Sequence, residues 1–504
     1  MKTMTAKVKD HSVHPLRPRA AVAEGDLPAQ VSIFRPFFLA GIFSVLTTGC
    51  MMGAVALYGI AQRASYTASA TTPYVLAHAN SQLFGWVGLF VMGFALQIHP
   101  PRRSRAKLYH QLAGWSLGLI AVAIALRFAA EPLVDHSRAL WMPVGILSGV
   151  LEALAVLLFI ANSGMTRAKT FDESSGKAVG LPWQSLFVFA SLGWWLAVSL
   201  VEPVVFALSH QPDKTTSILF VAKWFVPYRD SQFLGFVVNM IFGVALARFA
   251  AYFHLPEADR RLGLTGFVLW NAGLFTRCFG WVSMFNAGMQ PGTEWTYYVG
   301  GLLLAAGALY LVAASRAFER SVGSEGSVGV GAFGSMGSMG ISGVTSHTPH
   351  TSHTTPTFSL KYVRTALGWL LLSGVLFVLE PLHLRAVGAP FSHAYTGAIR
   401  HALTVGFISQ MILGVSTFAV PRLRGRPEMS ITASWAVLLL LNVGNTMRVA
   451  LQILTDYTPA AFAPMGISGF VELVALLIWA GYMVRTIVGR QTGRQPSNIA
   501  PALV

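Results

Sequence analysis

Charged residues are scarce in this chain, and acidic residues are the scarcer kind. Asp, Glu, Lys and Arg together make up 11% of the 504 residues, whereas an ordinary soluble domain carries about 25%. Hydrophobic residues make up 54%, and the mean hydropathy is +0.57. The scarcity of charge argues against a soluble enzyme, and lipid is the expected environment of most of the chain.

Cysteine is almost absent as well. The two cysteines, Cys50 and Cys278, both lie inside apolar runs rather than in loops. Their number and placement exclude a disulfide framework and a thiolate metal cluster. No short apolar segment follows a basic start before Ile33, so a cleavable signal peptide is not expected either.

Long apolar runs, in contrast, are plentiful. Twelve of them reach the roughly 20 residues that a transmembrane helix needs. They lie at about 33–60, 75–98, 108–131, 139–163, 181–208, 230–252, 262–284, 296–316, 361–383, 395–420, 430–455 and 462–487. The sequence therefore predicts an all-α integral membrane protein with twelve spans, whose main partner is the lipid bilayer.

The distribution of Lys and Arg predicts the orientation of these spans. The formal net charge of +16 would suggest nucleic-acid binding in a soluble protein, but most basic residues here lie in short loops. If the N-terminus lies in the cytoplasm, seven of the 36 basic residues lie on the outer side of the membrane. Three more lie near the ends of the apolar runs. The seven are Arg63, Arg138, Lys214, Lys223, Arg229, Arg385 and Arg400. The remaining 26 lie inside, so both termini are expected in the cytoplasm and a nucleic-acid partner is rejected.

The spans repeat in groups of four. Runs 2, 6 and 10 each carry two glycines eight residues apart, and an arginine follows the first glycine at a distance of 42 residues in every case. The glycine pairs are Gly85 and Gly93, Gly235 and Gly243, and Gly406 and Gly414; the arginines are Arg127, Arg277 and Arg448. Glycines at this spacing let a neighbouring helix approach closely. Because four crossings return the chain to the same side, the symmetry axis should run along the membrane normal.

This repeat divides the chain. The three repeats are expected at 33–180, 181–320 and 361–487, with cytoplasmic tails at 1–32 and 488–504. The segment 321–360 is rich in Gly and Ser and is expected to be a flexible cytoplasmic linker.

Two intramembrane histidines are the main candidates for chemistry. His78 lies near the outer end of run 2 and His401 near the outer end of run 10, and the three arginines reach the same side. An imidazole in lipid needs a partner. One interpretation is that the two histidines ligate a haem iron while Arg127, Arg277 and Arg448 hold its propionates. The alternative is that the histidines bond neighbouring helices and the arginines snorkel to the interface.

Weaker candidates lie elsewhere. His383 and His393 flank the outer loop before run 10 and are a candidate site for a second metal. Glu152 and Glu472 are intramembrane carboxylates that suit either a proton relay or a structural hydrogen bond.

Three short stretches resemble a known family. They are FRPFF at Phe34–Phe38, HANSQLFG at His78–Gly85 and HALTVG at His401–Gly406, and they are similar to the NnrS family of the bacterial nitric oxide response. The resemblance implies an inner-membrane protein that contains haem and copper, lowers nitrosative stress, and arranges twelve helices in three arcs like the core subunit of haem-copper oxidases. The family's span 2 motif reads His-Ala-His-Glu, whereas Asn80 and Ser81 stand at its last two positions here.

The leading hypothesis is therefore a haem-bearing membrane protein that binds nitric oxide or passes electrons in nitrogen-oxide stress. Reduction of dioxygen at a haem-copper pair is not expected, because runs 6 and 7 contain no histidine. The alternatives are a transporter of an anion or metabolite that uses the arginines as an outward-facing site, and a non-catalytic membrane subunit that docks a redox partner protein. Parallel repetition counts against alternating access.

Overall fold

The computed structural model describes residues 32–66, 72–99, 101, 103–166, 181–320 and 357–489. Apart from an isolated bridge between Pro101 and Thr166, this part of the chain contains helices and no strand. The expected all-α class is confirmed. The expected N-terminal tail, most of the expected linker and nearly all of the C-terminal tail lie outside the described residues.

Eleven helical segments of the described ranges are long and apolar enough to cross a membrane. Seven of them centre on one α-helix each: α5 (Ala106–Leu133), α6 (Arg138–Ser163), α7 (Ser185–Ser209), α11 (Pro291–Ser315), α12 (Thr357–Val387), α15 (Ile431–Leu454) and α16 (Phe462–Val488), which the turn η6 (Pro459–Ala461) precedes. Another is α1 (Phe34–Ser44), η1 (Val45–Gly49) and α2 (Cys50–Arg63) in sequence. The expectation of a multi-pass membrane protein agrees with this number of long apolar helices.

The other three are composite helices of a common design. Each contains an eight-residue π-helical stretch between two α-helices: α3 (Thr72–Asn80), η2 (Ser81–Gly88) and α4 (Leu89–Ile98); α8 (Lys214–Asp230), η4 (Ser231–Val238) and α9 (Asn239–Phe253); and α13 (His393–His401), η5 (Ala402–Ser409) and α14 (Gln410–Arg424). In all three, the first glycine of the predicted pair is the fifth residue of the π-helical stretch. A π-helical stretch often marks a functional site.

The remaining long helix is α10 (Arg260–Ala287), which corresponds to the seventh predicted span. Its 28 residues match α5 in length and it packs along α11. It is not among the eleven most apolar helices, because Arg277 and Asn271 lie in its middle and two arginines begin it. The expected total of twelve spans therefore depends on α10.

One predicted boundary is wrong by about four helical turns. The sixth span was expected to begin at residue 230, but its helix begins at Lys214, where the Asp213 carboxylate accepts hydrogen bonds from the backbone of Thr215 (3.2 Å) and Thr216 (3.0 Å). This cap starts a helix in sequence too polar to read as a span. Arg229, expected in an outer loop, instead lies in α8 with 4% of its surface exposed.

The glycine pairs make the close helix contacts that their spacing predicts. A Cβ atom on the first glycine of each pair would lie within 3 Å of a side chain on the long helix that precedes it. The side chains are Ser44 for Gly85, Trp194 for Gly235 and Trp369 for Gly406. The second glycines meet the same three helices at Phe37, Val188 and Tyr362. The same pair of helices thus packs in the same way three times.

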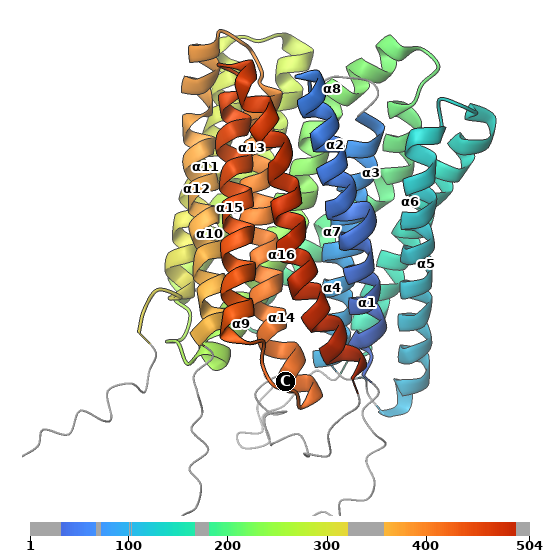
Figure 1. Ribbon diagram of the computed structural model, residues 1–504, viewed down its shortest axis with the longest axis vertical. Coiled ribbons are helices and arrows are strands. Elements are labelled where there is room, and N and C mark those ends of the chain that lie inside the picture. Colours follow the sequence, from blue (N-terminus) through green and yellow to red (C-terminus); the bar gives the residue numbers. More distant parts are fainter. Residues whose placement is uncertain are drawn as a thin grey trace, which may run out of the picture. The chain divides into compact units, whose positions relative to one another are not determined.

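Contacts between the groups of four follow a closed order. Helix α6 packs on α7, α11 packs on α12, and α16 packs on α2. Figure 1 shows the last long helix, drawn red, beside the first, drawn blue. The ends at which α3, α8 and α13 begin lie uppermost in Figure 1, and this end is called the upper end below.

Candidate functional site

The three arginines that recur in the sequence are all buried. Arg127 in α5, Arg277 in α10 and Arg448 in α15 have 1%, 2% and 7% of their surfaces exposed. A guanidinium group in a protein stays charged, and a buried charge needs a partner. The partners of the three arginines differ, and this difference defines the candidate site.

Arg127 is paired with two carboxylates. Its Nε donates to Glu131 Oε1 at 2.7 Å, and its Nη2 lies 2.8 Å from Glu202 Oε1. Its guanidinium also stacks over the ring of Phe206, 4.5 Å from the centroid. Because its charge is paired with carboxylates of the protein, Arg127 is a poor candidate for binding an anionic ligand.

Arg277 repeats the arrangement. Its Nη2 lies 2.9 Å from Glu380 Oε2, and its Nε lies 3.4 Å from Asp230 Oδ2. Its guanidinium donates to the hydroxyl of Tyr297 and lies 3.9 Å from the centroid of that ring. Two of the three arginines are therefore bound by acidic side chains of the protein.

The two main acidic partners come from equivalent places, which the sequence analysis missed. Glu202 precedes Pro203 in α7, and Glu380 precedes Pro381 in α12. Each of these helices begins the next group of four, so each arginine pairs across the junction between groups. The Glu-Pro dipeptide that recurs in these two helices is the sequence feature from which these partners could have been predicted. At the third junction the equivalent helix is α1 to α2, and Phe34–Arg63 contains no acidic residue.

Arg448 has no ion pair and no hydrogen bond with any described residue. Its Nε and Nη1 are buried without a partner. The groups that act on its charge are Tyr66 and, more weakly, Glu472. Tyr66, in the loop after α2, cannot neutralise it, because burial raises the pKa of the Tyr66 phenol above its usual value and the group stays protonated. An unpaired buried cation costs several kcal/mol, and no carboxylate of a described residue is within ion-pair distance of Arg448 to offset this cost.

The two candidate histidines lie beside this unpaired arginine. Arg448 and His78 are both electrostatic neighbours of His401, and Arg448 is a neighbour of His78. His78 fits against Gly53 of α2, where an added Cβ would lie 2.5 Å from the ring. The structure thus brings together His78, His401 and Arg448 at the junction whose following helix, α1 to α2, carries no acidic residue.

Both imidazole rings are oriented by the same kind of bond. Nδ1 of His78 donates to the carbonyl of Gly49 at 2.8 Å, and Nδ1 of His401 donates to the carbonyl of Gly397 at 2.9 Å. Because a carbonyl oxygen only accepts, each Nδ1 carries the hydrogen and each Nε2 keeps its lone pair. Neither Nε2 has a hydrogen bond within the described ranges. A metal-ligating histidine typically shows this arrangement.

The two histidines are partly exposed. His78, His401 and Arg400, the residue before His401, each keep an intermediate share of their surface accessible.

Arg229 is a further buried cation and Arg400 a half-buried one, and both were expected on the outer side of the membrane. Each precedes the first glycine of its pair by six residues. Arg229 Nη1 donates to Gln232 Oε1 at 2.7 Å, whereas Nε and Nη2 of Arg400 are buried without partners. This shared spacing to the glycine is the sequence feature that could have identified the two arginines as equivalent.

The other predicted metal ligands lie apart from this site. His383 uses both ring nitrogens: Nε2 lies 2.7 Å from Asp456 Oδ2, and Nδ1 lies 3.1 Å from the Tyr457 hydroxyl. His393 is exposed and packs edge to face on Phe391. Within the described part of the chain, no group of three or more His, Cys, Asp or Glu side chains is arranged to hold a metal ion.

The carboxylates Glu152 and Glu472 are both buried. Glu152 Oε2 accepts a hydrogen bond from Asn80 Nδ2 at 3.3 Å, whereas Oε1 of Glu472 has no partner. Glu472 packs against Gly444, one turn before Arg448 on α15, where an added Cβ would lie 2.7 Å from its Cγ. It is therefore the carboxylate next to the candidate site.

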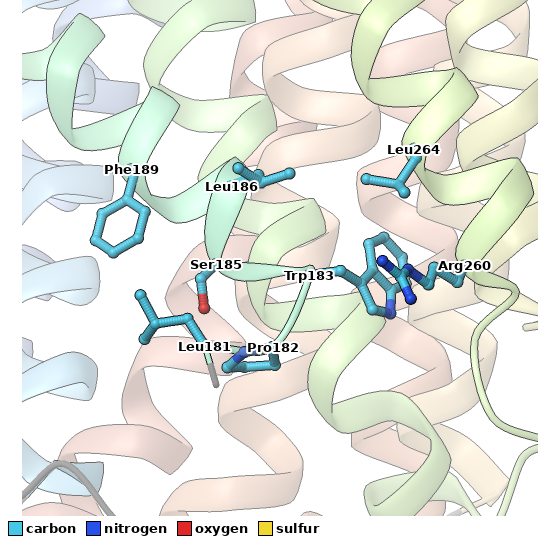
Figure 2. A pocket seen from close by; sticks show the side chains of 8 residues that line it. All are labelled: Leu181, Pro182, Trp183, Ser185, Leu186, Phe189, Arg260 and Leu264. Carbon is cyan, nitrogen blue, oxygen red and sulfur yellow. The ribbon is translucent and has the colours of Figure 1, made fainter. Parts of the chain in front are cut away.

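A pocket of about 500 Å³ lies away from these residues. Figure 2 shows Trp183 and Ser185 at the start of α7, and Arg260 and Leu264 at the start of α10. Its lining contains none of the candidate site residues.

A comparison with models of known protein families finds no match, and a search of curated proteins finds no matching relative.

Proposed function

We propose that the chain is a haem-bearing membrane protein of the NnrS type, in which His78 and His401 ligate the iron and Arg448 holds a propionate. One observation carries the proposal. Three equivalent junctions each contain a buried arginine, and the junction whose following helix carries no Glu-Pro glutamate is the one that contains both histidines. A propionate carboxylate would supply the anion that Arg448 lacks.

The chain's own residues support this assignment. The Gly49 and Gly397 carbonyls hold the two Nδ1 hydrogens, which fixes the tautomer and leaves both Nε2 atoms available for a metal. Arg127 and Arg277 are already paired, so the propionate role narrows from three arginines to Arg448. When bound, a haem would supply an iron that takes up nitric oxide or passes electrons.

The proposal includes the architecture. Helix α10 is taken as the twelfth span, and the three groups of four are taken as three arcs around an axis along the membrane normal. The repeated glycine contacts and the packing of α16 on α2 support this arrangement. The excess of basic residues in alternate loops supports cytoplasmic termini in a bacterial inner membrane, with the upper end in Figure 1 facing outward.

The test is an optical spectrum of protein purified in detergent from a haem-replete host. The expected result is a Soret band that shrinks in His78→Ala and in His401→Ala. His110→Ala is the matched control, because His110 is an exposed histidine on α5. Colourless wild-type protein, or equal spectra for all variants, would end the proposal. Metal analysis of the same samples reports whether copper is present.

Anion binding is the second candidate, and the unpaired Arg448 favours it. In this case the Arg448 guanidinium holds a small anion from the outer side, without haem. Colourless protein that is stabilised by an added anion, with the stabilisation lost in Arg448→Gln, would support this alternative. Uptake of the labelled anion into proteoliposomes then separates transport from binding.

A further inference from the structure

A second cavity lies below the histidines, where the three composite helices meet. Its volume is about 110 Å³. Positions five, six and nine after the first glycine line it in all three helices: Phe90, Val91 and Phe94 of α4; Met240, Ile241 and Val244 of α9; and Met411, Ile412 and Val415 of α14. Because equivalent positions of the three helices converge on it, the cavity lies on the axis that relates them.

The lining of this cavity is almost purely apolar. Ser416 provides a hydroxyl, but it donates to the Leu413 carbonyl of its own helix at 3.2 Å. A buried water needs two to four polar partners, and apolar cavities of about 150 Å³ stay dry and bind benzene or xenon. The cavity described here is smaller, so it suits a monatomic or diatomic apolar molecule.

The lining differs in its exposure from position to position. The residues at position five, Phe90, Met240 and Met411, are buried, with at most 8% of their surfaces exposed. The residues at positions six and nine keep accessible surface in all three helices. A charged or strongly hydrated occupant of this apolar lining would have to shed its water with nothing to replace it.

We propose that this cavity binds a small apolar gas molecule, and that nitric oxide is its occupant if the proposed function holds. Val415 lies 14 residues beyond His401, which corresponds to about 20 Å along a helix. The cavity would then hold gas about three to four helical turns below the candidate haem site. The binding of gas itself does not depend on haem.

Xenon is the probe, because it is apolar, inert and visible by anomalous X-ray scattering. Crystals of the detergent-purified protein under xenon pressure should show a xenon peak among Ile241, Val244 and Val415. Val415→Phe should fill the cavity and remove the peak. Val443→Phe makes the same change on α15 at a residue with 51% of its surface exposed, and it should leave the peak unchanged.

The outcomes separate this inference from the proposed function. If Val415→Phe does not fold, Ile241→Phe or the smaller change Val415→Leu tests the same wall. Absence of xenon from the wild-type cavity, an acyl or detergent chain in its place, or a peak that survives both filling variants would overturn the inference. Xenon in colourless protein would uphold it while ending the haem proposal, and a Soret band without xenon would do the reverse.

Discussion

Arg277 Nη2 lies 2.9 Å from Glu380 Oε2, and this pair joins the second group of four helices to the first helix of the third. Arg127 and Glu202 join the first group to the second in the same way, at 2.8 Å. Arg448 is the equivalent residue at the junction of the third group with the first, and it meets no glutamate there. The buried ion pairs thus hold two junctions, and Arg448 at the third has no such pair with a described residue.

Breaking one of these pairs should be costly. Glu380→Gln leaves the buried Arg277 with Asp230 as its remaining carboxylate, and breaking a buried pair costs about 3–5 kcal/mol. Thermal unfolding in detergent measures the loss. Asp135→Asn is the control, because it removes an exposed partner of Lys214, for which about 1 kcal/mol or less is expected. Equal losses for the two variants would contradict this account.

Neutralising the unpaired arginine should have the opposite effect on protein free of any ligand. Arg448→Gln removes a buried charge that has no partner, so cofactor-free protein should be as stable as wild type or more stable. Arg127→Gln leaves Glu131 and Glu202 buried without their cation and should destabilise strongly. Unfolding temperatures of the two variants measure the contrast. A large loss in Arg448→Gln would show that Arg448 is paired after all.

The glycine contacts predict a stability cost that depends on position. A Cβ on Gly406 would lie 2.5 Å from Trp369 Cγ, and overpacking of this kind costs about 1–3 kcal/mol. Gly406→Ala should therefore lower the unfolding temperature in detergent. Gly481→Ala is the matched control, since an added Cβ at Gly481 meets nothing within 4 Å. If the two variants unfold alike, the helices are not in close contact at Gly406.

The cap of α8 predicts a dependence on pH. Hydrogen bonds from Thr216 and Thr215 lower the pKa of Asp213 below its usual value. A lowered folded-state pKa stabilises the helix start at pH values above the unfolded pKa, and this effect is lost as the pH falls through the folded pKa. Asp213→Ala should speed amide hydrogen exchange at the start of α8 near neutral pH, whereas Asp135→Ala should not.

This difference should disappear on acidification. Below the folded-state pKa of Asp213 the wild-type carboxyl is protonated, and it then accepts the backbone hydrogen bonds less well. Unfolding of wild type and Asp213→Ala, compared at neutral pH and at a pH below the usual Asp value of about 3.9, checks this convergence. A difference that persists in acid would assign the effect to something other than the carboxylate.

The long helices and their internal repeat could be predicted from the sequence. Lipid requires each span to satisfy its own backbone, so length and hydropathy alone predict most helices. The register of the glycines and arginines is likewise a local property of the chain, and it holds in the structure. The prediction was wrong where hydropathy was a poor guide, at the polar helix that begins after Asp213. Helix α10 lies where the seventh span was predicted, but it is not among the eleven helices apolar enough to cross a membrane.

What the sequence by itself determined was therefore the helices, their threefold register and the candidate residues. Only the tertiary structure decided which arginines are occupied, because Glu202 and Glu380 come from helices that belong to the next group and are remote in sequence. It also decided that His78, His401 and Arg448 share one junction. Charge pairing is settled by which helices pack together, and one-dimensional patterns do not contain that information.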